Sequence, residues 1–151
     1  MELAPYGAVI CVNEAITVVP GDWFVYSDPH VPSSHRPLVK PKGICRYVFG
    51  DSYGDNADLL DGVPVTRFQD MNIGQHPDYT VIAALGLARH LQAEKIDVFG
   101  ADMVPEDVPH RGEDRWVIER NSFNRYVNKL AQWSGIEVVR WEAVHGAADA
   151  E

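Results

Sequence analysis

The sequence has few residues of the kinds that build disulfide scaffolds, metal centres or membrane spans. It has two cysteines among 151 residues, Cys11 and Cys45, and each lies in an apolar segment. Both are therefore expected to be buried thiols rather than a disulfide pair. No apolar run approaches the roughly 20 residues that cross a bilayer, so no membrane span is expected. The first residues lack a basic stretch followed by an apolar core, so we expect no secretion signal and a cytoplasmic location.

Positive charge is also scarce. Lysine and arginine number 13 against 22 aspartates and glutamates, which gives a formal net charge of −9. Proteins that bind nucleic acid cluster lysines and arginines to neutralise phosphates, and no such cluster is present. We therefore expect no nucleic-acid partner. A small phosphorylated ligand is compatible with this charge, because backbone N–H groups at a helix start and one or two arginines are enough to hold it.

The common catalytic and cofactor motifs are missing as well. There is no glycine-rich dinucleotide or P-loop fingerprint, no nucleophile elbow, and no histidine or cysteine spacing of the zinc-binding kind. The six histidines form no recognised metal motif. No obligatory cofactor is expected. Mg²⁺ remains an option, because Asp28 and Asp102 could hold the ion together with substrate phosphates.

The residues that are present are typical of a globular α/β protein. Hydrophobic residues make up 46% and charged residues 23% of a chain with the length of one ordinary domain. Continuous apolar runs predict buried strands, and longer periodic segments predict helices. Strands are predicted at residues 8–12, 23–26, 44–49, 63–68, 96–99 and 136–141, and helices at residues 77–92 and 114–134. This order predicts an α/β fold with a mostly parallel sheet of about five strands, in which Pro64 favours an edge position for its strand.

Polar residues follow several of these strands at the point where each strand ends. Asn13 follows the first strand, Ser27 and Asp28 follow the second, and Asp102 follows the strand at 96–99. Thr80 lies near the start of the buried helix. Because ligands bind at the carboxyl ends of parallel strands, these residues are predicted to gather around one cleft. The alternative interpretation is that they are ordinary turn-forming and helix-starting residues.

Four blocks of the sequence resemble Rossmann-like sialyltransferase-type proteins, which include the bacterial family-42 sialyltransferases and the motility-accessory-factor proteins. The segments AVICVNEAI at 8–16 and DWFVYSD at 22–28 are similar to the opening strand pair of that group. The segments TVIAALGLA at 80–88 and KIDVFGADM at 95–103 are similar to its helix–strand–Gly–x–Asp block. The resemblance covers about residues 7–140. It implies a single Rossmann-like, three-layer domain over residues 1–141, with 142–151 as a flexible tail.

The resemblance also implies a nucleotide-sugar donor and roles for individual residues. Asn13 would contact the nucleotide phosphate or sugar, and Thr80 would lie at the helix start that faces the phosphate. Asp102 would border the sugar or acceptor pocket. His110 would be the base that deprotonates the acceptor hydroxyl, which would give inverting transfer without an obligatory metal. Members of the group usually carry a further strand and a Gly-x-Gly-Pro-Ser turn before the first block, and the residues ahead of Ala8 do not supply that turn.

Three hypotheses about function follow. The first is a small glycosyltransferase-like protein that binds a nucleotide or nucleotide sugar through Asn13, Ser27, Asp28 and Thr80, with His110 and Asp102 as catalytic residues. The second is a non-catalytic binding or interaction protein on the same scaffold. The third is a Mg²⁺-dependent enzyme that acts on a nucleotide or phosphate. The tyrosine and tryptophan content of the strands suggests self-association as a homo-oligomer.

Overall fold

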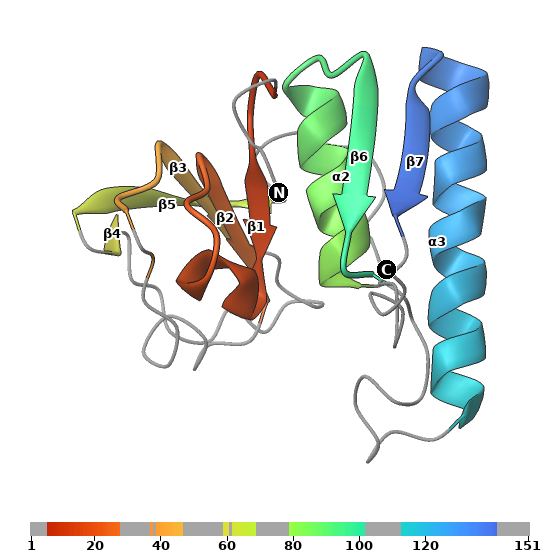
Figure 1. Ribbon diagram of the computed structural model, residues 1–151, viewed down its shortest axis with the longest axis horizontal. Coiled ribbons are helices and arrows are strands. Elements are labelled where there is room, and N and C mark those ends of the chain that lie inside the picture. Colours follow the sequence, from red (N-terminus) through yellow and green to blue (C-terminus); the bar gives the residue numbers. More distant parts are fainter. Residues whose placement is uncertain are drawn as a thin grey trace, which may run out of the picture. The chain divides into compact units, whose positions relative to one another are not determined.

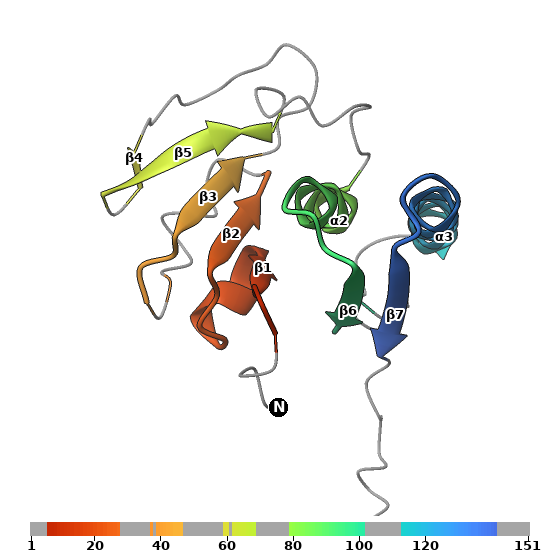
Figure 2. The same cartoon turned by 90° about the horizontal axis from the view of Figure 1, so that it is seen from above.

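The computed structural model describes residues 6–27, 37, 39–46, 59–60, 62–68, 79–101 and 113–141. The chain forms two compact units, Met1–Leu87 and Ala88–Glu151. The first unit contains a five-stranded sheet and the second contains a two-stranded sheet. Figure 1 and Figure 2 show the elements of each unit in two views.

The first unit is built on a largely parallel sheet with the strand order β1-β2-β3-β5-β4. Its strands are β1 (Ile10–Val12), β2 (Trp23–Tyr26), β3 (Gly43–Arg46), β4 (Leu59–Leu60) and β5 (Val63–Arg67). The pairs β1–β2, β2–β3 and β3–β5 are parallel, and only the β4–β5 pair is antiparallel. The carboxyl ends of β1, β2, β3 and β5 therefore share one edge of the sheet (Figure 2).

One face of the sheet carries a hydrophobic core, and Val25 and Cys45 are fully buried on the other face. Side chains that are two residues apart on a strand point to the same face. The residues of this core, all buried, come from the strands and from the 3₁₀ helix η1 (Asn13–Thr17): Cys11, Ile16, Phe24, Tyr26, Ile44 and Val63. The rings of Phe24 and Tyr26 lie 5.3 Å apart between centroids. The helix η1 was not predicted, because its five residues are too few to show a helical period.

Close packing on the opposite face requires a glycine. A Cβ atom added to Gly43 would lie 2.2 Å from Cζ3 of Trp23, its register partner on β2. Real Cβ atoms do not approach other atoms this closely. The indole of Trp23 therefore lies over the backbone of β3, and only glycine leaves room for it.

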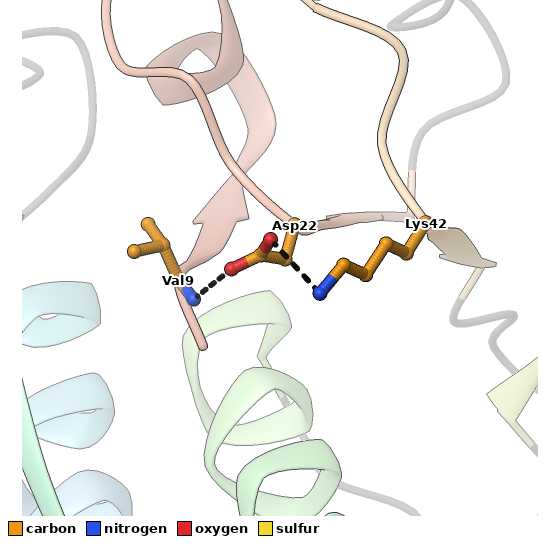
Figure 3. A network of polar contacts seen from close by, with 3 residues as sticks. All are labelled: Val9, Asp22 and Lys42. Atoms are coloured by element: carbon orange, nitrogen blue, oxygen red, sulfur yellow. Dashed lines mark hydrogen bonds and ion pairs between the residues drawn. The ribbon is translucent and has the colours of Figure 1, made fainter. Parts of the chain in front are cut away.

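The amino-terminal edge of the sheet is held by Asp22, which comes just before β2. Oδ2 of Asp22 accepts a hydrogen bond of 2.8 Å from the backbone N–H of Val9, and its Oδ1 lies 3.6 Å from Nζ of Lys42 (Figure 3). The backbone of Asp22 adds three more hydrogen bonds: its N–H donates to the carbonyl of Val9, and its carbonyl accepts from the N–H groups of Lys42 and Gly43. One residue thus joins the segments that enter β1, β2 and β3.

Replacing Asp22 tests which of these contacts stabilises the edge. We expect Asp22→Ala to lower the free energy of unfolding by about 1.5–3 kcal/mol, because the N–H of Val9 loses a charged acceptor. Lys42→Ala should cost less than about 1 kcal/mol, since the lysine is largely exposed and its ion pair is screened. Urea unfolding of both variants measures the two values. Equal losses in the two variants would show that the ion pair, and not the backbone hydrogen bond, stabilises the edge.

The helix α2 (Thr80–His90) begins in the first unit and ends in the second. Every residue from Ile82 to Ala88 is buried, as predicted for a helix that is apolar all round. Within the described residues the helix starts at Thr80, two to three residues later than the sequence pattern indicated.

The second unit contains β6 (Lys95–Phe99), α3 (Glu113–Ser134) and β7 (Glu137–Trp141). The two strands pair in parallel along their whole length, from Lys95 opposite Glu137 to Phe99 opposite Trp141. The helix α3 buries Phe123 and Leu130. It ends at Gly135, which has a φ of +65°, and Ile136 N–H donates to the carbonyl of Leu130. This arrangement is a glycine C-cap.

The predicted α/β class and mostly parallel sheet are confirmed. The edge position of the strand at 63–68 was wrong. Leu59–Leu60 forms β4, a strand that is absent from the predicted ones. As a result β5 has a neighbour on each side, so it is not the edge strand that Pro64 suggested. Pro64 is tolerated because it lies opposite Leu59 of this two-residue strand and ahead of the β3–β5 pairing, which starts at Val65.

Candidate functional site

The carboxyl edge of the first sheet brings together polar residues from four neighbouring strands. The register aligns Val12 of β1 with Val25 of β2, so Asn13 and Ser27 both come just past the ends of their strands at this edge. Tyr26, Arg46 and Arg67 are register partners at the ends of β2, β3 and β5. This edge lies at the opposite end of the strands from Asp22.

Ser27 and Thr80 are in direct contact. Their hydroxyl oxygens, Oγ and Oγ1, lie 3.0 Å apart although the residues are 53 positions apart in the chain. The bond joins the end of β2 to the first residue of α2. It therefore holds the amino terminus of α2 at the carboxyl edge of the sheet, where first-turn N–H groups and the helix dipole favour an anion. The structure thus brings together two of the predicted site residues.

Asn13 has two unusual features. Its φ of +52° lies in the left-handed region, which asparagine tolerates better than most residues. Its side-chain Oδ1 is buried and has no hydrogen-bond partner. A buried polar atom without a partner is costly, and such atoms in folded proteins often mark a position for water, an ion or a ligand.

A second buried atom of this kind lies at the same edge. In the described part of the chain, the buried side-chain polar atoms without a hydrogen-bond partner are Oδ1 of Asn13 and Nε of Arg46. This statement concerns the Nε atom alone, because the residue Arg46 does interact with other parts of the protein. The two atoms come from the ends of β1 and β3, on either side of the strand that leads to Ser27. At the amino-terminal edge, by contrast, the carboxylate of Asp22 is engaged at both oxygens.

Arg46 and Arg67 were missed in the sequence. Each is the last residue of an apolar strand and was interpreted as part of that strand. Arg46 is only 7% exposed, and Arg67 is half-buried. The signal that could have identified them is a charged residue at the carboxyl end of an otherwise apolar parallel strand, which is where such sheets bind ligands.

Three of the predicted site residues, Asp28, Asp102 and His110, lie outside the described residues. Their predicted roles therefore stay predictions. Within the described part of the chain, no three histidine, cysteine, aspartate or glutamate side chains come close enough together to hold a metal ion. Also within that part, no helix is long and apolar enough to cross a membrane.

The two cysteines are not candidates for a reactive role in this site. Both are buried, and neither forms a disulfide, as the sequence predicted. Burial raises the pKa of the Cys45 thiol to about 12, and burial together with the Asp22 carboxylate raises the pKa of Cys11. Thiolates are the reactive form of cysteine, so neither residue is suited to act as a nucleophile.

The arrangement at the carboxyl edge can recognise an anion. It offers two hydroxyls, one side-chain amide, two guanidinium groups and a helix start, and all of these groups can donate hydrogen bonds to phosphate oxygens. The groups come from residues that are far apart in the sequence and that the parallel register aligns. Comparison of the chain with protein-family models, curated proteins and solved structures finds no match.

Proposed function

We propose that this protein binds a nucleotide or nucleotide sugar at the carboxyl edge of its first sheet, with the ligand's phosphate at the start of α2. The observation that carries the proposal is the hydrogen bond between Ser27 and Thr80, which holds the start of α2 at the edge where Asn13 has a buried Oδ1 without a hydrogen-bond partner. Bound phosphate, a sugar hydroxyl or the water that they order would satisfy this atom.

Each residue then has a role of its own. The hydroxyls of Ser27 and Thr80 each act as donor or acceptor, so one of them can turn its hydrogen toward a phosphate oxygen while their mutual contact keeps both in place. Asn13 accepts from a sugar hydroxyl through Oδ1 or donates to a phosphate oxygen through its amide N–H₂. The roles of Asn13 and Thr80 match those implied by the resemblance to the sialyltransferase-type proteins.

The resemblance also supports a reaction. In this proposal the ligand is a nucleotide-sugar donor, the nucleotide phosphate is the leaving group, and His110 removes the proton of the acceptor hydroxyl. No metal is obligatory in such a transfer. Binding of the donor is the part of the proposal that the carboxyl edge supports, and it can be tested without knowledge of the acceptor.

A thermal-shift panel tests the proposal. Nucleoside monophosphates, nucleoside diphosphates and nucleotide sugars are each added with and without Mg²⁺. At about 100 times the dissociation constant, a ligand should stabilise the protein by about 2.7 kcal/mol, and it should do so without the metal. Thr80→Val should weaken binding about tenfold, because it removes a hydroxyl of the phosphate site and keeps the side-chain shape.

Thr66→Val is the matched control. Thr66 is exposed on β5, and the substitution removes the same hydroxyl group and keeps the side-chain shape. It should leave nucleotide binding as in the unmodified protein. Stabilisation that requires Mg²⁺ would favour the metal-dependent alternative. If no ligand of the panel stabilises the protein, the proposal is overturned and a non-catalytic interaction protein is favoured.

A further inference from the structure

Two aromatic side chains lie together at the carboxyl end of the second unit's sheet. Phe99 and Trp141 are the last residues of β6 and β7 and are register partners, so they point to the same face. Their ring planes differ by 11°, and the ring centroids lie 6.1 Å apart. The two residues are 44% and 51% exposed. Single exposed apolar residues are common on protein surfaces, but an aligned pair of exposed rings indicates a binding surface.

The indole of Trp141 is held in one orientation by the neighbouring strand. Its Nε1 donates a hydrogen bond of 3.3 Å to Oδ1 of Asp97, which lies two residues before Phe99 on the same face. Oδ1 of Asp97 also lies 3.9 Å from Nζ of Lys95. The ring surface is therefore ordered before a ligand arrives, which lowers the entropy cost of binding.

The other end of this strand face is polar. Lys95 and Glu137 are register partners at the first positions of β6 and β7, and both are exposed. Four residues of strand separate them from the two rings, a distance of about 13 Å. The face therefore offers a ring surface at one end, and an ammonium donor and a carboxylate acceptor at the other.

The size and charge of this face disfavour a macromolecular partner. At about half exposure, two aromatic side chains offer on the order of 200 Å². A stable protein interface buries about 800 Å² on each partner, so the rings alone are too small for one. Nucleic acid is disfavoured by the formal net charge of −9. The face itself carries two carboxylates, Asp97 and Glu137, against one ammonium, and this balance also disfavours a small anion.

We propose that Phe99 and Trp141 form the centre of a binding site for a neutral saccharide. The C–H groups on one face of a sugar ring carry partial positive charge and pack against the electron-rich ring of an aromatic side chain. Sugar hydroxyls both donate and accept hydrogen bonds, so they suit the ammonium of Lys95 as well as the carboxylate of Glu137. The site belongs to the second unit, and the inference does not depend on the proposed nucleotide site.

Backbone amide and indole N–H chemical shifts, recorded while neutral saccharides are titrated in, test the inference. The panel contains maltotriose, cellotriose, lactose and triacetylchitotriose, and sorbitol serves as a polyol without a ring. We expect at least one saccharide to shift the indole N–H of Trp141 and the amide of Phe99 to saturation, and sorbitol to shift neither. Followed at the amide of Val98, Trp141→Ala should weaken binding at least about tenfold. Phe99→Leu keeps the apolar volume and loses the ring, so it should weaken binding about threefold.

Trp133→Ala is the control for the loss of an indole. Trp133 is 67% exposed on α3, where its ring contacts Nζ of Lys129, and it is not part of the strand face. We expect this variant to bind saccharide as the unmodified protein does. Equal losses in Trp133→Ala and Trp141→Ala would overturn the inference, and so would the absence of a saturable shift with every saccharide.

Two other results would replace the saccharide with a different occupant. If AMP shifts the indole of Trp141 and no saccharide does, the rings bind a nucleobase and the inference is wrong. If the same resonance shifts when the protein alone is diluted, the rings contact a second copy of the chain. Nucleotide-induced shifts at Asn13 and Ser27 that persist in Trp141→Ala would leave the proposed function standing in either case.

Discussion

The Asn13→Asp variant is expected to bind nucleotide about 100-fold more weakly than the unmodified protein. The two side chains have nearly the same shape, and aspartate tolerates the left-handed backbone conformation that Asn13 adopts. The substitution changes the amide to a carboxylate, which repels phosphate and can no longer donate to it. At the short distances of a direct contact and an effective dielectric constant of about 20, this repulsion approaches 4 kcal/mol, and part of it is lost to screening and adjustment. Titration with the nucleotide that stabilises the protein most measures the loss.

Asn124→Asp is the control for this change. Asn124 is exposed on α3 in the second unit, so the substitution adds the same negative charge at a position that is not part of the first sheet. We expect its nucleotide affinity to change less than about twofold, because a solvent-exposed charge is screened by salt. If the two variants weaken binding equally, net charge and not a specific contact controls affinity. If Asn13→Asp binds as the unmodified protein does, Asn13 has no place in the site.

The Phe24→Ala variant is expected to lose about 3–5 kcal/mol of unfolding free energy. Phe24 is fully buried at the centre of the first unit's core and packs against Tyr26. Truncation removes the transfer free energy of the ring and leaves a cavity that strands joined on both sides are poorly able to close. Since native domains are stable by only about 5–15 kcal/mol, this loss is large. Urea unfolding followed by circular dichroism gives the value.

Val18→Ala provides the comparison for this experiment. Val18 is a hydrophobic residue of the same unit but is 73% exposed, so its truncation should cost less than about 0.5 kcal/mol. A loss below about 1 kcal/mol for Phe24→Ala would mean that the core on this face of the sheet is not the main source of stability.

The fold could be predicted where the sequence pattern is typical of one type of secondary structure. Buried parallel strands are continuous apolar runs, and this identified β1, β2 and β3 and their pairing class. The short hairpin of β4 and β5 was missed, although it has a sequence signal. Asp61-Gly62 separates the two strands, and such a dipeptide favours a two-residue hairpin turn. Gly62 adopts a φ of +80°, in agreement with that signal.

The site could be predicted only in part, for a physical reason. The rule that ligands bind at strand ends led to Asn13, Ser27 and Thr80, and the contact between Ser27 and Thr80 depends on packing that no local pattern encodes. Arg46 and Arg67 were not among the predicted site residues, because only the register places these two arginines side by side. Register is set by pairing across the sheet, so it is not visible in either strand alone.

Backbone amide chemical shifts, recorded while the nucleotide that stabilises the protein most is titrated in, test the central claim most directly. If phosphate binds at the carboxyl edge of the first sheet, the largest shift changes should fall on Asn13, Ser27 and residues 80–82, and Val9 and Asp22 at the opposite end of the strands should change little. Largest changes on β6 and β7, or on Val9 and Asp22, would contradict it.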